Sequence, residues 1–317
     1  MSKATLAVCY RRDQPVQPVE VGNTRAGFEQ LVKVCGPPCR FVMEATGTYY
    51  LALAYPLHEQ GGQVAVRNPL GIKRFLHRQL SKGKSDRKHA QWLRRYGPQQ
   101  PVKVWQPDET VLVECRPLEQ VTEQVVKQKT MVCHALEALT RQPVIRPVAR
   151  QRLEQTKRLL EEPRQAVETE LLALLEQRFA PEMALLCSIP GIGRKTAGLL
   201  LLAGGFARLD TYRPQVAKAG LSPREHTCGA SLRGKGRLTQ MGGGLLRGKL
   251  FLCRFSAKKF NAACKARYNR LVAKGKNGKG ALIAVCNKLL KQAFPILKSG
   301  VPYQADFCSK LTVSLGF

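Results

Sequence analysis

The sequence predicts an N-terminal α/β domain, a helical middle region and a helical C-terminal domain. Up to about residue 106, short apolar runs alternate with amphipathic stretches, as strands alternate with helices. Strand patterns are missing from residues 107–181, where apolar residues recur at helical spacing between charges. Residues 182–317 are helical in pattern, rich in glycine and very basic. A chain of 317 residues is long enough for about two domains. Because the pattern changes twice, we expect boundaries after residues 106 and 181, with the helical middle region as a linker between the two domains.

The first region is expected to hold four strands and three helices. The strands are short runs rich in apolar residues, at residues 4–10, 15–21, 39–45 and 63–69. The helices have apolar residues at three- and four-residue spacing, at residues 23–36, 46–61 and 87–96. Asn23 or Thr24 can cap the first helix, and prolines mark the second strand as an edge strand. This mixed order predicts an α/β sheet domain.

Two long helices are expected in the middle region, over residues 111–139 and 149–179, joined near Pro143 and Pro147. Leucine recurs along one side of each. Such a stripe is explained either by packing within the chain or by a coiled-coil seam between two copies. Neither explanation gives the stripe a catalytic role.

The charge balance predicts a polyanionic partner. The chain has 52 Lys and Arg against 22 Asp and Glu, a formal net charge of +30, and residues 221–300 contain 18 basic residues and a single acid, Glu225. Each phosphate that Lys or Arg neutralises releases a condensed counterion, which makes nucleic acid a favourable partner. A membrane surface is the competing polyanion, but we expect no spanning helix, because no apolar run approaches about 20 residues. We also expect no signal peptide, because the first residues do not have the pattern of one.

Eleven cysteines are scattered without repeated pairing. Cys35 and Cys39 form the only close pair, and their spacing matches neither a thioredoxin-type motif nor half of a zinc site. We therefore expect reduced thiols, as in a cytosolic protein.

A glycine-containing turn at residues 189–197 (IPGIGRKTA) lies between two apolar helices. This pattern is typical of a helix-hairpin-helix motif. Gly191 and Gly193 allow the turn, backbone N–H groups of the next helix can bind a DNA phosphate, and Arg194 and Lys195 add charge. The alternative is a plain helical hairpin whose glycines serve packing.

A second glycine-rich stretch, residues 228–237 (CGASLRGKGR), contains one hydroxyl among cations. Ser231 is flanked by Arg233, Lys235 and Arg237. A serine is a poor nucleophile unless a base or metal assists it, but guanidinium groups can stabilise a pentacovalent phosphate transition state. The alternative is a serine that only contacts phosphate.

Two carboxylates have the positions that ribonuclease-H-type nucleases require. Glu44 ends an expected strand, and Asp86 stands among Lys and Arg before an expected helix. Such enzymes collect several carboxylates around Mg²⁺, which prefers an octahedron of oxygen ligands. For Asp86 the alternative is a helix N-cap in a solvated loop.

Several motifs, in order along nearly the whole chain, resemble one family. They are residues 42–75 (beginning VMEATGTYY), 84–93 (KSDRKHAQWL), 188–197, 219–225 (AGLSPRE), 229–239 (GASLRGKGRLT) and 297–303 (LKSGVPY). The resemblance is to the IS-one-ten (insertion sequence one hundred and ten) family of DEDD-type transposases, related to the Piv/MooV DNA invertases.

This resemblance implies a RuvC-like, ribonuclease-H-fold domain over 1–106, a coiled-coil linker over 107–181 and a C-terminal transposase domain over 182–317. It also implies strand exchange on DNA with Mg²⁺, a serine nucleophile and a structured guide RNA. From the two long helices, and because recombination must cut several strands together, we expect a homo-oligomer, a dimer or a tetramer. We expect it in the cytoplasm, associated with the bacterial nucleoid. The matching residues are Glu44 and Asp86 as acidic metal ligands and Ser231 as the nucleophile.

Two positions depart from the family pattern. The family's first aspartate would precede Met1, so we expect in-frame codons upstream that encode it. His89 stands where the helix motif usually has an aspartate, and imidazole suits transition metals better than Mg²⁺. Two alternatives therefore stay open: a DNA- or RNA-binding remnant without catalysis, and a Holliday-junction-type nuclease that uses metal alone.

Overall fold

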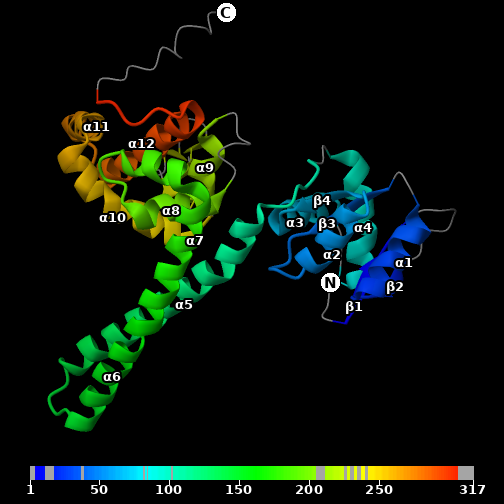
Figure 1. The fold of residues 1–317 in the computed structure, drawn as a ribbon, viewed down its shortest axis with the longest axis horizontal. Coiled ribbons are helices and arrows are strands. Elements are labelled where there is room, and N and C mark those ends of the chain that lie inside the picture. Colours follow the sequence, from blue (N-terminus) through cyan, green and yellow to red (C-terminus); the bar gives the residue numbers. More distant parts are fainter. Residues whose placement is uncertain are drawn as a thin grey trace, which may run out of the picture. The chain divides into compact units, whose positions relative to one another are not determined.

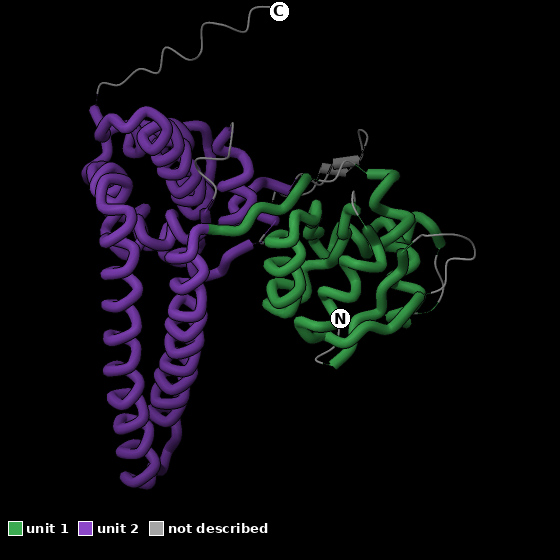
Figure 2. Tube along the Cα trace, turned by 45° about the vertical axis from the view of Figure 1, so that its right-hand side comes forward, with its two compact units in different colours: residues 1–108 green, residues 109–317 purple. Residues whose placement is uncertain are grey.

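The chain folds into two compact units, residues 1–108 and 109–317, in a computed structural model (Figure 2). The structure describes residues 4–10, 18–36, 39–80, 83, 85–100, 103–204, 211–224, 227–228, 232–233, 237–239 and 242–305. For residues 227–228, 232–233 and 237 only the backbone is described.

Unit 1 contains two strand pairs. The strands are β1 (Thr5–Val8), β2 (Val19–Gly22), β3 (Arg40–Glu44) and β4 (Gln63–Arg67) (Figure 1). β1 and β2 pair antiparallel, whereas β3 and β4 pair parallel with Glu44 opposite Arg67. Within the described residues these are separate two-stranded sheets rather than one continuous sheet. The four strands lie where the apolar runs predicted them.

Four helices complete unit 1: α1 (Arg25–Cys35), α2 (Leu51–Glu59), α3 (Pro69–Arg78) and α4 (Asp86–Gln99). Thr24 caps α1 by accepting from the Gly27 N–H at 3.3 Å. The prediction missed α3, although Asn68 accepts from the Leu70 N–H at 2.8 Å and Pro69 occupies the first turn, which is a favourable helix start. The main core combines strand and helix residues: Leu6, Phe28, Leu31, Met43, Leu57 and Val64.

Unit 2 begins with a long helical hairpin of three helices, one in the outgoing arm and two in the returning arm (Figure 1). Its helices are α5 (Thr110–Leu139), α6 (Pro147–Leu159) and α7 (Glu161–Cys187) (Figure 1). Arg178 pairs with Glu109 at 3.0 Å near one end, and Lys129 pairs with Glu161 farther along. The second predicted helix is divided at Leu160. Pro163 explains the break, because it has no N–H to donate to the carbonyl four residues earlier.

The remaining described residues of unit 2 form helices and short strands. The helices are α8 (Arg194–Ala203), α9 (Arg213–Lys218), α10 (Gly244–Phe260), α11 (Ala262–Ala273) and α12 (Gly278–Ser299). The strands are β5 (Pro223–Arg224), β6 (Thr227–Cys228), β7 (Leu232–Arg233) and β8 (Arg237–Leu238), paired as β5–β8 and β6–β7. One large core joins α7, α8, α10 and α12.

One described helix, α12, meets the length and composition of a membrane span, contrary to the expectation from the sequence. It has 22 residues and a mean hydropathy of 1.2. Its apolar residues Val285, Leu289 and Leu290 are fully buried in the core of unit 2. Core packing therefore accounts for its composition.

Candidate active site

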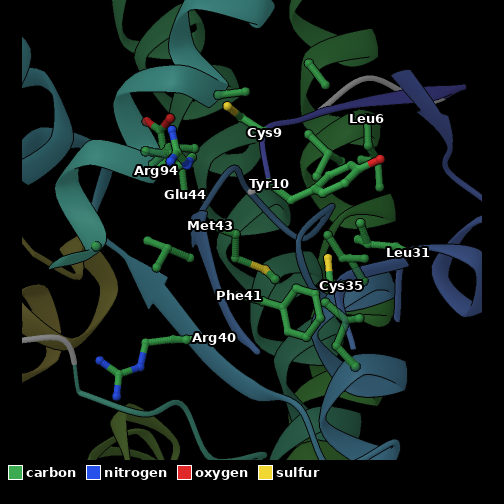
Figure 3. Close-up of a pocket in the computed structure, with 18 of the residues that line it drawn as sticks. Leu6, Cys9, Tyr10, Leu31, Cys35, Arg40, Phe41, Met43, Glu44 and Arg94 are labelled. Atoms are coloured by element: carbon green, nitrogen blue, oxygen red, sulfur yellow. The ribbon is translucent and has the colours of Figure 1, made fainter. Parts of the chain in front are cut away.

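Unit 1 contains a cavity of about 700 Å³ (Figure 3). Residues from β1, β3, α1, α2 and α4 line it. Glu44, Asp86 and His89, which the sequence singled out, are all among the lining residues. The cavity thus brings the predicted acidic positions to one place.

The strand pairing of β3 positions Glu44. It is the last residue of β3, and the next residue, Ala45, still donates its N–H to the Arg67 carbonyl at 2.8 Å. The parallel ladder therefore holds the backbone on both sides of Glu44. Its side chain is 23% exposed, so the carboxylate is partly shielded but accessible from the cavity.

The start of α4 positions Asp86 and His89. Ser85 caps this helix, and its hydroxyl accepts from the Lys88 N–H at 3.3 Å. Asp86 is therefore not the cap but the first residue of the helix, where the helix dipole favours a negative charge. His89 follows three residues later, on the same face, and both residues line the cavity.

A direct hydrogen bond connects Glu44 and His89. Nε2 of His89 lies 2.6 Å from Oε2 of Glu44, and both side chains are about three-quarters buried, at 24% and 23% exposure. A carboxylate that accepts from one imidazole nitrogen places the proton on that nitrogen, which leaves Nδ1 as an acceptor. The pair can thus hold the imidazole ring in one orientation.

The side chains of Glu44, Asp86 and His89 could hold a metal ion only if they converged on one point. Within the part of the chain that the structure describes, no group of three His, Cys, Asp or Glu side chains converges on one point. Mg²⁺ prefers oxygen ligands, whereas here the imidazole of His89 occupies one oxygen of Glu44. The described residues therefore do not form a Mg²⁺ site by themselves, and metal binding by Glu44, Asp86 and His89 stays a prediction.

The prediction missed Arg94, which also lines the cavity (Figure 3). Arg94 hydrogen-bonds Cys9, opposing the effect of burial, which raises the pKa of that thiol. Arg94 follows Asp86 by eight residues on α4, so it lies on the same helix face. This spacing from Asp86 is the feature of the sequence that could have identified Arg94 as a lining residue. Its guanidinium gives the acidic cavity a group suited to a phosphate.

The predicted helix-hairpin-helix turn lies between α7 and α8. Gly191 has φ of +106°, and a Cβ there would lie 2.7 Å from that of Ala257, so packing and backbone both require glycine. Gly193 is the N-cap of α8, and a Cβ there would meet nothing within 4 Å. The turn forms as expected, whereas phosphate binding by it stays a prediction.

Carboxylates of α7 engage both basic residues of this turn. Arg194 makes two hydrogen bonds to Glu176, of 2.7 and 2.6 Å, and Lys195 bonds Glu168 at 2.8 Å. Glu176 raises the pKa of Arg194, mainly through this hydrogen bonding. A phosphate at the turn would compete with these ion pairs.

The predicted serine loop is only partly described. Ser231 and Lys235 lie outside the described residues. Arg233 is in β7 and Arg237 in β8, where the backbone alone is described. Their roles in attack and phosphate binding stay predictions.

The nine cysteines whose side chains are described are free. Cys35 and Cys39 both line the cavity of unit 1, and a hydrogen bond from the Cys35 thiol lowers the pKa of Cys39 to about 7. The spacing alone did not reveal this contact between the two thiols.

Comparison with known proteins covers most of the chain. Residues 2–143 match a family model described as Transposase, the DEDD domain of IS110 elements, and residues 183–269 match one described as Transposase IS116/IS110/IS902 family. The pilin gene-inverting proteins of Moraxella bovis and Moraxella lacunata are each 26% identical over 322 residues, covering 96% of this chain and 95% of theirs.

A third relative matches over a shorter stretch. The insertion element IS110 43.6 kDa protein of Streptomyces coelicolor is 30% identical over 145 residues, which is 45% of this chain and 35% of that protein. The first family model implies a ribonuclease-H-like fold, and the parallel β3–β4 pair in unit 1 is compatible with that fold. Two family models in order, with relatives aligned from end to end, lead to one conclusion. The chain belongs to the IS110 family of transposases.

Proposed function

We propose that this transposase family member cuts and rejoins DNA strands through a serine nucleophile, guided by a structured RNA and acting as a homo-oligomer. The family supports a transposase or recombinase that acts on DNA. The observation that carries the proposal is the meeting of Glu44, Asp86 and His89 at one cavity, in the region matched by the transposase model.

In the proposed reaction, Oγ of Ser231 attacks the phosphorus of a phosphodiester. A P–O bond to Ser231 forms while its hydroxyl loses a proton, the P–O bond to a DNA oxygen breaks, and that oxygen leaves as a hydroxyl after gaining a proton, so that no net proton is released. A hydroxyl of another strand then attacks the phosphoserine, which restores the phosphodiester and the serine. No oxidant or nucleotide is needed, because the phosphoserine keeps the energy of the broken bond.

The cavity of unit 1 supplies groups for a phosphate and its proton. Arg94 can pair with a phosphate oxygen, and the imidazole of His89, held by Glu44, can take up or release a proton at Nδ1. The family also suggests a divalent metal.

The test uses a plasmid that carries the genomic DNA on both sides of the gene. The full chain, co-expressed with transcripts of that DNA, is expected to yield joined strand-exchange products, read by sequencing the junctions. Hydrolysed ends without joining would contradict the proposal and support a metal-only nuclease. Unchanged DNA that the protein still binds would also contradict it and support a binding remnant.

The binding remnant is the second candidate, and one observation favours it. His89 occupies a position where the family motif has a carboxylate, and its bond to Glu44 uses a prospective metal ligand. In that case the chain would bind DNA or RNA and leave every strand intact.

A further inference from the structure

A second cavity, of about 400 Å³, lies between α11 and α12 of unit 2. Four cations line it: Arg267 and Arg270 from α11, and Lys288 and Lys291 from α12. On each helix the two residues are three positions apart, so each pair lies on one face. The cavity therefore has a row of two positive charges on either side. We call it the α11/α12 groove.

Among the described residues, no acidic side chain pairs with the charges of this groove. The sequence has no Asp or Glu between residues 226 and 305. None of the four cations makes an ion pair with a described residue. Arg194 and Lys195, in contrast, are both engaged by carboxylates of α7. Four cations around one cavity repel one another, and an anion placed among them would relieve that repulsion.

The contacts that the groove residues do make leave their charge available. Lys291 lies 4.7 Å from the ring centre of Tyr212, and its hydrogen bond lowers the pKa of that tyrosine. The charge of Lys288 acts on the Cys264 thiol, whose pKa burial raises to about 12. Both neighbours are neutral in their ordinary protonation state near pH 7. The groove thus keeps its positive charge.

The shape of the groove suits an extended strand. Small side chains also line it: Ala263 and Ala266 from α11 and Ala284 from α12. Such small side chains let a ligand backbone approach both helices closely. Carboxylate and thiol ligands are absent from its lining, so a metal ion does not fit.

We infer that the α11/α12 groove binds the phosphodiester backbone of a nucleic-acid strand, with phosphates held between Arg267 and Arg270 on one side and Lys288 and Lys291 on the other. This inference rests on the proposed function, because it gives the DNA or RNA of that reaction a binding site. The site is separate from the hairpin turn at residues 189–197 and from the cavity of unit 1.

The test compares two double variants of the full chain that remove the same charge. Arg267→Gln with Arg270→Gln empties one side of the groove. Lys265→Gln with Lys279→Gln removes two exposed cations of α11 and α12 that do not line it. Affinity is measured by fluorescence anisotropy with single-stranded DNA, single-stranded RNA and duplex DNA of one sequence, at several salt concentrations.

The groove variant is expected to bind about tenfold more weakly, and its log–log salt slope should fall by about 1.5, since two phosphate contacts are lost. The control variant should lose no more than about twofold and keep nearly all of its slope. A loss with RNA alone assigns the groove to RNA, a loss with DNA alone assigns it to DNA, and a loss with both indicates the shared backbone. Equal losses for the two variants would overturn the inference.

A third variant tests shape without changing charge. Ala266→Leu fills the groove, keeps all four cations and suits a helix. It should weaken binding about fivefold or more, with an unchanged melting temperature as the control for folding. Wild-type affinity in this variant would overturn the inference even if the charge variants bind weakly. Joined DNA products from the wild-type chain would then leave the proposed function standing, whereas a wild-type chain that binds no nucleic acid would contradict both.

Discussion

Nε2 of His89 lies 2.6 Å from Oε2 of Glu44, which joins the first turn of α4 to the end of β3. The two residues are 45 positions apart in the sequence. Their bond makes a carboxylate–imidazole pair where the family is expected to collect carboxylates. The chemistry of unit 1 therefore depends on whether Glu44 and His89 act together in proton transfer or serve as ligands of a metal ion.

The first prediction replaces His89 with a carboxylate. His89→Asp puts two acids side by side, so without metal it should lower stability by about 1 kcal/mol. With millimolar Mg²⁺ the same variant should regain stability, because a second oxygen ligand adjoins Glu44. Thermal unfolding with and without Mg²⁺ measures both effects. His89→Asn is the control, since it loses the imidazole without adding charge, and an equal Mg²⁺ response in the two variants would refute the prediction.

The second prediction separates the two glycines of the turn before α8. Gly191→Ala should lower the free energy of unfolding by about 2–3 kcal/mol, because the backbone has φ of +106° and the new methyl would meet Ala257. Gly193→Ala should cost less than about 1 kcal/mol, since its φ is −98° and the space is open. Chemical denaturation measures both. Equal costs would show that the packing described at Gly191 is wrong.

The third prediction concerns phosphate binding at the same turn. Glu176→Gln removes the carboxylate that holds Arg194 through two hydrogen bonds. If the turn binds phosphate, freeing this guanidinium should tighten DNA binding about threefold or more at low salt. Glu170→Gln, an exposed change on the same helix, is the control for net charge. Equal affinities in these two variants would leave the turn with a packing role alone.

The fourth prediction concerns thiol reactivity. Cys39 has a pKa of about 7, because the Cys35 thiol donates a hydrogen bond to its thiolate. Its alkylation by iodoacetamide should therefore rise with pH to half its maximum near pH 7, since the thiolate is the nucleophile. Cys35→Ala should move that midpoint toward 9, and mass spectrometry of the Cys39 peptide measures it. A wild-type midpoint near 9 would show that the two thiols do not interact.

Local patterns predicted the placement of several candidate residues. The apolar run ending in an acid placed Glu44 at the end of β3, and the glycine spacing predicted the turn before α8. Asp86 was harder to place, because Ser85 and Asp86 are both good helix caps and only the backbone geometry selects Ser85. The choice between these two adjacent cap residues moves the start of the helix by only one residue.

Long-range contacts could not be predicted from patterns. The spacing of charges in the basic turn does not show that Glu176 and Glu168 of α7 pair with Arg194 and Lys195. The sequence showed that residues 221–300 are very basic. It did not show that four of these cations line one cavity, because a count of charges does not say how the residues are arranged in space. The Glu44–His89 bond is of the same kind, because it depends on how α4 packs against β3.

The central claim, a covalent serine mechanism, is tested most directly by trapping the protein–DNA adduct. Labelled DNA from the flanks of the gene is incubated with the full chain, separated on a denaturing gel, and the linked peptide is identified by mass spectrometry. We predict an adduct on Ser231 that disappears in Ser231→Ala, while DNA affinity stays nearly unchanged because the Arg and Lys contacts remain. An adduct that survives Ser231→Ala would contradict this mechanism and point to another hydroxyl, with Thr227 and Thr239 as the candidates on either side of Ser231 in the sequence.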